Sequence, residues 1–342
     1  MPGALQRPAV VSRVSDLVGY TPLLELASTG TGSRLLLKLE MFNPTGTAKI
    51  RMARAMVDAA EAAGELRPGG RIVESTSGNT GLGLAVIAAE RGYTFTAVVD
   101  HHACPDKLRG MKALGTELVY VVGDGTEELA TAAREELAED MARGQDNTVF
   151  TEQHNNPANG VGYFPVAHEL HEALGGRIDV LIGAVGTGGA LCGTGRELRT
   201  LMSGFTVIGV EPKGSIAFGG PAHDYYQSGT GTPEGAEIGA LVDFDLIDEG
   251  VKVGDIEAFA TCRAVARTGL LIGGSAGGVV HEALNRLPSL PPGTTMVALV
   301  NDGGEKYMDT VFDDDWMRAR GLLDPEAERE IEELLTKLRG NR

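Results

Sequence analysis

Short apolar runs alternate along the chain with longer stretches in which apolar residues recur at helical spacing. The short runs predict buried strands at 35–37, 71–73, 95–99, 118–122, 180–182, 207–210, 270–272 and 295–300. The longer stretches predict helices over 49–63, 79–91, 106–114, 126–143, 190–202 and 256–267. This alternation favours an α/β fold with parallel sheets and right-handed crossovers. In such sheets, ligands bind beyond the carboxyl ends of the strands.

Two stretches lie outside this alternation. Residues 214–242 are rich in glycine and lack periodicity, and a long irregular segment inside a compact fold is usually functional or mobile. The charged stretch 324–340 predicts a capped, solvated helix that takes no part in chemistry.

Composition narrows the class of partner. The 342 residues include 30 Lys and Arg against 47 Asp and Glu, and this net charge of −17 disfavours nucleic acid and anionic membranes as partners. The N-terminus lacks the apolar core of a signal peptide, and no run reaches the roughly 20 apolar residues that span a bilayer. Cys104, Cys192 and Cys262 form no CxxC pair, and the adjacent His101 and His102 are interpreted as strand-end residues. We therefore expect a cytoplasmic protein with a small-molecule ligand and no metal.

Two loops that open helices carry candidate chemistry. Residues 43–49 (NPTGTAK) place Lys49 in a first helical turn, beside unpaired N–H groups and the positive end of the helix dipole. That environment disfavours the ammonium form, as an aldimine-forming lysine requires. Residues 74–81 (ESTSGNTG) offer hydroxyls, an amide and helix-start N–H groups, which suit a carboxylate ligand. Taken alone, the two loops also fit a surface lysine and a helix cap.

Two glycine loops follow later strands. The glycines of residues 186–189 (GTGG) let backbone N–H groups close around a phosphate. A dinucleotide fingerprint fails there because residue 191 is leucine, and no GxxxxGK[ST] occurs in the chain. Residues 273–277 (GGSAG) match GxSxG, so a serine hydrolase is a rival interpretation. Its histidine would have to be His281, which is predicted to lie within the following helix.

In this order and spacing, the loops resemble those of the cysteine synthase and cystathionine β-synthase family of pyridoxal-phosphate (PLP) enzymes. The resemblance runs from Gly19-Tyr20-Thr21-Pro22-Leu23 to about Tyr307. It implies fold type II, with two three-layer αβα domains, mainly parallel twisted sheets and PLP between the domains. The larger, phosphate-binding domain would comprise 12–45 and 151–325, the smaller mobile domain 46–150, and a C-terminal helix 326–342. Family members are commonly homodimers, which the resemblance implies here.

The resemblance also assigns the residues of the site. Lys49 would hold PLP as the internal aldimine and act as the catalytic base. The other cofactor-binding residues would be Asn79 at the 3′-oxygen, Ser275 at the ring nitrogen, Asp302 in the closing motif 301–307, and Gly186, Thr187, Gly188 and Gly189 at the phosphate. The substrate carboxylate would be bound by Thr76, Ser77, Gly78, Thr80 and Gln153.

A neutral serine at the ring nitrogen makes the ring a weaker electron sink than a carboxylate would, which favours β-elimination over a long-lived quinonoid. The resemblance therefore implies β-replacement on an O-activated L-serine, O-acetyl- or O-phospho-serine. Lys49 would take the α-proton, the leaving group would depart to give an α-aminoacrylate, and a nucleophile would add at the β-carbon. Sulfide or another thiol is the expected nucleophile.

Several positions depart from the family pattern. They are Ile50 after the lysine, Ala190 after the phosphate loop, Gly162 before Tyr163, the stretch 164–167 and Asn301. We expect several of these around the substrate pocket, where they would change the nucleophile. Arg51 or Lys213 could offset a phosphate leaving group.

Three alternative functions stay open. One is a specialised synthase of the 2,3-diaminopropionate pathway type, which joins O-phosphoserine to an amino-acid nucleophile. Another is a cystathionine synthase or a serine/threonine dehydratase. The third is an inactive PLP-fold scaffold that binds a partner protein.

Overall fold

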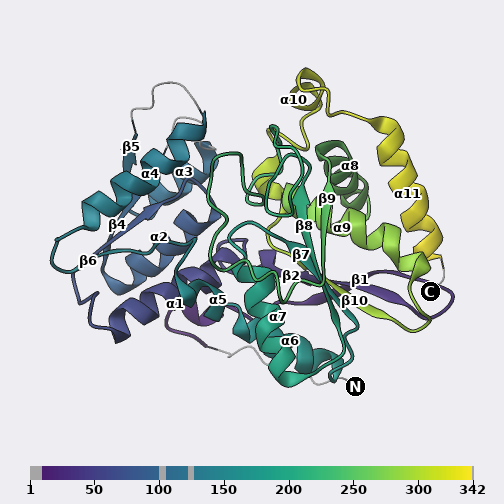
Figure 1. The fold of residues 1–342 in the computed structure, drawn as a ribbon, viewed down its shortest axis with the longest axis horizontal. Helices are drawn as coiled ribbons and strands as arrows, with labels where there is room; N and C mark the ends of the chain where they lie inside the picture. Colours follow the sequence, from purple (N-terminus) through teal and green to yellow (C-terminus); the bar gives the residue numbers. More distant parts are fainter. Residues whose placement is uncertain (1–9, 100–104, 122–126, 341–342) are drawn as a thin grey trace.

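The computed structural model describes residues 10–99, 105–121 and 127–340 and contains two mainly parallel sheets (Figure 1). The six-stranded sheet has the order β1 (Leu23–Ser28), β2 (Arg34–Leu39), β10 (Thr295–Val300), β7 (Val180–Ala184), β8 (Thr206–Pro212) and β9 (Glu249–Val253). Only β1 is antiparallel to its neighbour. The four-stranded sheet is parallel, in the order β5 (Glu117–Tyr120), β4 (Thr94–Val99), β3 (Arg71–Ser75) and β6 (Thr148–Phe150).

Helices cover both sheets. With the four-stranded sheet lie α1 (Lys49–Ala62), α2 (Asn79–Arg91), α3 (Pro105–Ala113) and α4 (Glu127–Ala142). The larger sheet is covered by α5 (Pro157–Val161), α6 (Phe164–Leu174), α7 (Gly189–Leu201), α8 (Asp255–Ala266), α9 (Gly274–Arg286) and α11 (Pro325–Arg339), with α10 (Asp314–Ala319) before α11. Short 3-10 helices span Val14–Leu17, Glu40–Phe42, Leu287–Ser289 and Gly304–Tyr307.

The two-residue period of each strand divides the core into layers. In β3, Ile72 packs with the α1–α2 side, whereas its neighbour Val73 packs against Ala138 of α4. In β10, Val297 faces the α6–α7 side and Ala298 faces the α8–α9 side. Because successive side chains of a strand point to opposite faces, each sheet is buried on both sides. The predicted α/β fold is therefore confirmed, as two helix–sheet–helix sandwiches.

The six predicted helices are each confirmed to within one residue of their expected bounds. The predicted strand at 270–272 is wrong. Ile272 makes only an isolated bridge to Gly303, so this segment has no ladder partner and serves as a short connection between α8 and α9. Strands β1, β6 and β9 were not predicted, because β6 is three residues long and the other two mix polar with apolar positions. Val122, His101, His102 and Cys104 lie outside the described residues.

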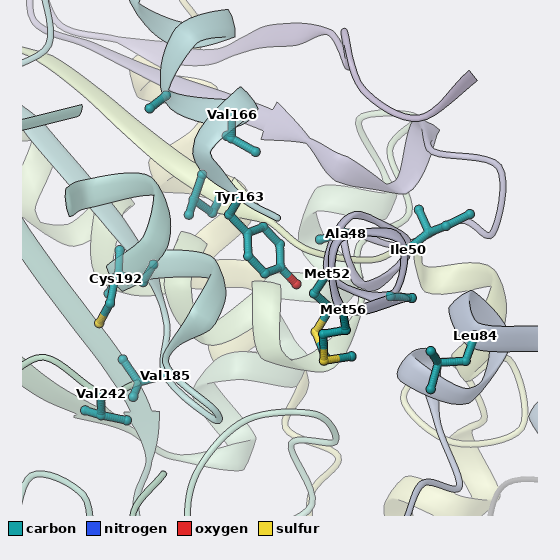
Figure 2. Close-up of a cluster of buried hydrophobic side chains, with 14 of the residues drawn as sticks. Ala48, Ile50, Met52, Met56, Leu84, Tyr163, Val166, Val185, Cys192 and Val242 are labelled. Atoms are coloured by element: carbon teal, nitrogen blue, oxygen red, sulfur yellow. The ribbon is translucent and has the colours of Figure 1, made fainter. Parts of the chain in front are cut away.

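One hydrophobic cluster joins the two sheets. In Figure 2, Met52 and Met56 of α1 face the ring of Tyr163, whereas Ile50 lies on the other side of α1, towards Leu84 of α2. Tyr163 belongs to the turn between α5 and α6. Helix α1 therefore packs between α2, beside the four-stranded sheet, and the α5–α6 turn, beside the six-stranded sheet. Helix α1 is therefore packed along most of its circumference.

A buried ion network fixes the start of α1 to the larger sheet. Arg51 donates to Glu40 through Nε (2.6 Å) and Nη2 (2.9 Å), and to Glu169 of α6 through Nη1 (2.8 Å). Lys38 of β2 donates to the same Glu169 (2.5 Å). All four side chains are at least nine-tenths buried. Two cations and two carboxylates thus balance one another away from water, as buried charges require.

Replacing Arg51 should unfold the protein at markedly lower denaturant. Arg51→Met leaves Glu40 and Glu169 short of a cation, and breaking a buried pair costs about 3–5 kcal/mol. The matched control is Arg329→Met, whose exposed pairs with Glu326 and Glu333 are worth about 0–1 kcal/mol. Urea unfolding followed by circular dichroism measures both. Equal, small losses would contradict the structural role of Arg51.

Candidate active site

The predicted site residues meet in one cavity of about 640 Å³. It lies at the carboxyl ends of β3, β6, β7 and β10, where α1, α2, α7 and α9 begin. The predicted residues that line it are Lys49, Thr76, Ser77, Gly78, Asn79, Thr80, Gln153, Gly186, Thr187, Ser275 and Asp302. Gly188 and Gly189 do not border the cavity; they form the turn that leads from Thr187 into α7. Residues from both sheets are therefore brought together.

Lys49 is the first residue of α1 and is partly exposed on the cavity side. Burial lowers the pKa of its amine to about 8, and the negative charge of Asp302 opposes that shift. The sequence analysis also predicted a lowered pKa for Lys49. It attributed the shift to the helix start, whereas the main cause in the structure is burial. The segment before it is fixed in place, because Ala48 N–H donates to the Asn301 carbonyl (2.8 Å) at the end of β10.

Asp302 organises the wall beside Lys49. Its Oδ2 accepts hydrogen bonds from Asn79 Nδ2 (2.8 Å) and from the Tyr307 hydroxyl (2.7 Å). Lys306 Nζ donates to Asn79 Oδ1 (3.2 Å) and to the carbonyls of Thr45 and Gly46. The Asn79 amide is thus oriented, and one of its two Nδ2 hydrogens remains for a ligand.

The loop from Thr76 to Thr80 forms the opposite part of the cavity. Thr76 Oγ1 accepts from Gly81 N–H (3.2 Å), which leaves its own hydrogen for a ligand. Gln153 accepts from the Thr80 hydroxyl (2.7 Å) and donates to the Ser75 carbonyl (3.2 Å). Gln153 therefore contacts this loop directly, and its role in binding a substrate carboxylate stays a prediction.

Glu74 supports Gln153 from below the loop. Thr151 donates to the Glu74 carboxyl (2.6 Å), and Gln153 N–H also donates to it (3.3 Å). Burial raises the pKa of Glu74 to about 8, although these hydrogen bonds oppose the shift. Sequence reasoning did not assign this residue a role.

The 186–189 loop is shaped by close backbone approach. Gly188 has φ +85°, and a Cβ placed on it would lie 2.6 Å from the backbone of Leu241. Asn159 Nδ2 donates to the Gln153 carbonyl (2.6 Å) and to Thr187 Oγ1 (3.3 Å). Asn159 thereby connects the 186–189 loop with Gln153. Asn159 Oδ1 is buried without a hydrogen-bond partner within the described part of the chain. The sequence analysis did not identify Asn159 as a site residue.

The serine hydrolase interpretation is wrong. Ser275 borders the cavity near the start of α9, but His281 lies within the same helix. The ring nitrogens of His281 contact Thr261 (3.2 Å) and Asn285 (3.0 Å). The half-buried histidine is therefore paired with residues other than the serine.

The departures from the family pattern lie mostly in the core. Ile50 is fully buried, and Gly162 allows a close approach to α1, since a Cβ on it would lie 2.7 Å from Met52. Ala190 packs against the same cluster, as does Val166 of the 164–167 stretch. Asn301 alone among these substitutions borders the cavity. The expectation that several of them surround the substrate pocket is therefore wrong.

The two cations proposed for a phosphate leaving group lie elsewhere. Arg51 is held by Glu40 and Glu169, and Lys213 forms an exposed pair with Glu257 (3.1 Å). Neither lines the cavity. Lys107 of α3 does line it, and so do Arg134, Glu135 and His154, none of which was predicted. The irregular segment predicted at 214–242 contributes residues 228–237 and 239 to the cavity wall.

Comparison with known proteins agrees with this geometry. The model of the family described as pyridoxal-phosphate dependent enzyme matches residues 14–302. A relative from Sinorhizobium fredii, provisionally named a cysteine synthase, is 50% identical over 91% of this chain and 94% of its own length. The chain belongs to the cysteine synthase and cystathionine β-synthase family of PLP-dependent enzymes.

Two further relatives define how broad this family is. The crystal structure of a cysteine synthase from Entamoeba histolytica superposes with a TM-score of 0.83, at 27% identity over 97% of each chain, which identifies the fold of this enzyme as type II. An N-(2-amino-2-carboxyethyl)-L-glutamate synthase from Ralstonia nicotianae is 32% identical over 90% of this chain and 91% of its own length. The enzyme is thus cysteine synthase-like, and its relatives carry the names of more than one kind of synthase.

The residues present fit a PLP group. The lowered pKa of Lys49 suits an amine that bonds to an aldehyde. Asp302 Oδ1 is buried without a partner in the described residues, and the glycine turn at 186–189 exposes backbone N–H groups at a helix start. Within the described ranges, no helix is long and apolar enough to cross a membrane, and no cluster of His, Cys, Asp or Glu could hold a metal ion.

The lowered pKa predicts how Lys49 reacts in the PLP-free protein. Only the neutral amine is nucleophilic, so acylation of Lys49 should be slow below pH 8 and reach half its maximal rate near pH 8. The side-chain amine of an added Nα-acetyl-L-lysine standard should reach half its maximal rate near its reference pKa of about 10.4. Peptide mass spectrometry after timed labelling measures both. A Lys49 profile that coincides with the standard would contradict the burial effect.

Proposed function

We propose that the enzyme performs β-replacement on an O-activated L-serine, O-acetyl- or O-phospho-serine, with sulfide or another thiol as the nucleophile. The observation that supports this most is the position of Lys49, which borders the same cavity as the Thr76–Thr80 loop and Gln153. An amine with a lowered pKa therefore faces a site built from hydroxyl and amide donors.

PLP, when bound, supplies the electron sink that allows the α-proton and the β-substituent of an amino acid to be removed. Lys49 is its point of attachment and then carries the α-proton. Asn79, held by Asp302 and Lys306, would orient the ring through its free Nδ2 hydrogen. Ser275 would offer the ring nitrogen a neutral hydroxyl in place of a carboxylate. Residues 186–189 would hold the phosphate at the start of α7.

The substrate carboxylate is assigned to the loop residues Thr76, Ser77, Gly78 and Thr80, together with Gln153. The N–H groups at the start of α2 add the favourable end of the helix dipole. Because Gln153 is tied to Thr80 and, through its backbone, to Glu74, the site is preorganised before the substrate arrives. A fixed carboxylate leaves the amino group and the β-carbon directed towards Lys49.

A second candidate nucleophile is an amino acid. The relative from Ralstonia nicotianae carries the name of such a synthase. The cavity rim also carries the acidic residues Glu135, Glu234 and Glu237, which would attract an ammonium group. For the assembly we propose a homodimer, and for the chain a smaller mobile domain of residues 46–150.

Gly188→Ala should weaken PLP retention. The new methyl would sit 2.6 Å from the Leu241 backbone and push the 186–189 loop out of place. Gly204→Ala is the matched control, because Gly204 has a similar φ (+81°) with nothing within 4 Å of a Cβ. Both variants carry the same backbone strain of about 1–2 kcal/mol. We expect bound PLP, measured by absorbance after gel filtration, to fall for Gly188→Ala only, and equal retention would contradict the loop's role.

Product analysis tests the proposed reaction. PLP-loaded enzyme is incubated with O-acetyl-L-serine or O-phospho-L-serine and with sulfide, a thiol or an amino acid, and the products are identified by mass spectrometry. Lys49→Ala should lower turnover by at least about 100- to 10,000-fold, the usual contribution of an acid–base group. The matched control is Lys112→Ala, an exposed lysine of α3. Absence of any β-substituted product from the wild-type enzyme would overturn the proposal.

A further inference from the structure

Lys107 differs from the other buried cations. Three cationic side chains of the described residues are more than nine-tenths buried: Lys38 at 1%, Arg51 at 3% and Lys107 at 7% exposure. Lys38 and Arg51 both contact carboxylates. Lys107 instead lies over the ring of Tyr307, 5.2 Å from its centre, and has no carboxylate or other oxygen partner among the described residues. Lys107 also lines the cavity, and a cation that has no carboxylate partner among the described residues there is a candidate contact for an anionic ligand.

The position of Lys107 connects it to the site. It lies in the first turn of α3 and lines the same cavity as Lys49 and Asn79. The Tyr307 ring beneath it is anchored by the hydroxyl contact to Asp302. Lys107 is close enough to Lys306 to lower the pKa of that amine, although burial is the main cause of that shift. Lys107 therefore lines the cavity close to Asp302, with Tyr307 and Lys306 next to both of them.

The other charges of the cavity do not neutralise Lys107. Asp302 is the nearby carboxylate, and its single negative charge already acts on both Lys49 and Lys306. The acids of the cavity, apart from Asp302, stand at its rim: Glu135 has 44% of its side chain exposed, and Glu234 and Glu237 are exposed. Glu135, Glu234 and Glu237 therefore lie at the mouth of the cavity, whereas Lys107 lies deeper. An anionic group that is inside the cavity is attracted to Lys107.

We propose that Lys107 is a specificity-determining residue that holds the leaving group of the substrate, and that it selects a phosphoryl ester over a neutral acyl ester. The inference rests on the proposed β-replacement. The Cβ–O bond breaks with its electron pair on oxygen, and the new bond to Cβ comes from the nucleophile. The nucleophile's proton ends on the departing oxygen, so hydrogen phosphate leaves. The α-proton passes to Lys49 and returns to Cα. Lys107 offsets the dianion in the substrate and the charge that grows on the oxygen.

The test compares two substrates in one enzyme. O-phospho-L-serine and O-acetyl-L-serine are each titrated into PLP-loaded wild-type, Lys107→Met and Lys112→Met protein. Cofactor absorption gives dissociation constants, and sulfide turnover gives kcat/KM. Lys107→Met should lower kcat/KM for O-phospho-L-serine by roughly 10- to 100-fold, the value of a hydrogen bond to a charged group, and change that for O-acetyl-L-serine by less than about threefold. Lys112→Met, an exposed lysine on the same helix, should change neither.

The outcomes separate this inference from the proposed function. If neither substrate gives product with the wild-type enzyme, β-replacement is wrong and the inference falls with it. If the enzyme turns over O-acetyl-L-serine and Lys107→Met lowers kcat/KM for both substrates by the same factor, the proposed role of Lys107 is overturned, while the proposed β-replacement stands. Lys107→Arg keeps the positive charge and should retain most of the phosphoserine preference. Loss of that preference in the arginine variant, with PLP still bound, would also count against an electrostatic role.

Discussion

Arg51 sits where the two sheets are joined, and the placement of the reactive lysine depends on it. Its guanidinium is shared between Glu40 and Glu169, both on the side of the larger sheet, while its backbone belongs to the first turn of α1. Lys49 is two residues away in the same turn. Since buried ion pairs tolerate little displacement, this network fixes the helix start against the sheet whose loops complete the cavity.

The first turns of four helices lie together at the site. Asn79, Gly189 and Ser275 stand at or next to the first residue of α2, α7 and α9, and Lys49 stands at the first residue of α1. Parallel sheets direct these starts to the same edge, because each strand ends there and each helix returns. Helix starts favour negative charge, so a protein of net charge −17 can still gather anionic ligands at this edge. Asp302 is the exception, and it supplies the counter-charge that Lys49 and Lys306 need.

Charge inside the cavity is unevenly distributed, and this bears on substrate choice. Glu135, Glu234 and Glu237 lie at the rim, whereas deeper in the described part of the cavity Lys107 lies near the carboxylate of Asp302 and the amine of Lys306. When the α-carboxylate of a substrate is held in place, the charges of the cavity would decide where the substituent on its β-carbon lies. The substitutions that looked decisive in the sequence, Ile50 and Gly162 among them, act on the packing of α1 instead.

The sequence by itself determined the local features: strand and helix periodicity, the order of the four loops, and the lysine at a helix start. Those are set by residues near one another in the chain, and the family motifs around Lys49, Asn79 and Ser275 are of this kind. Only the tertiary structure decided the rest. The lack of a strand at 270–272, the inward position of Lys107 and the core role of Ile50 depend on contacts between residues 31 to 200 positions apart. No local period encodes which of those segments meet, because burial and charge pairing are settled only when both sheets pack around α1.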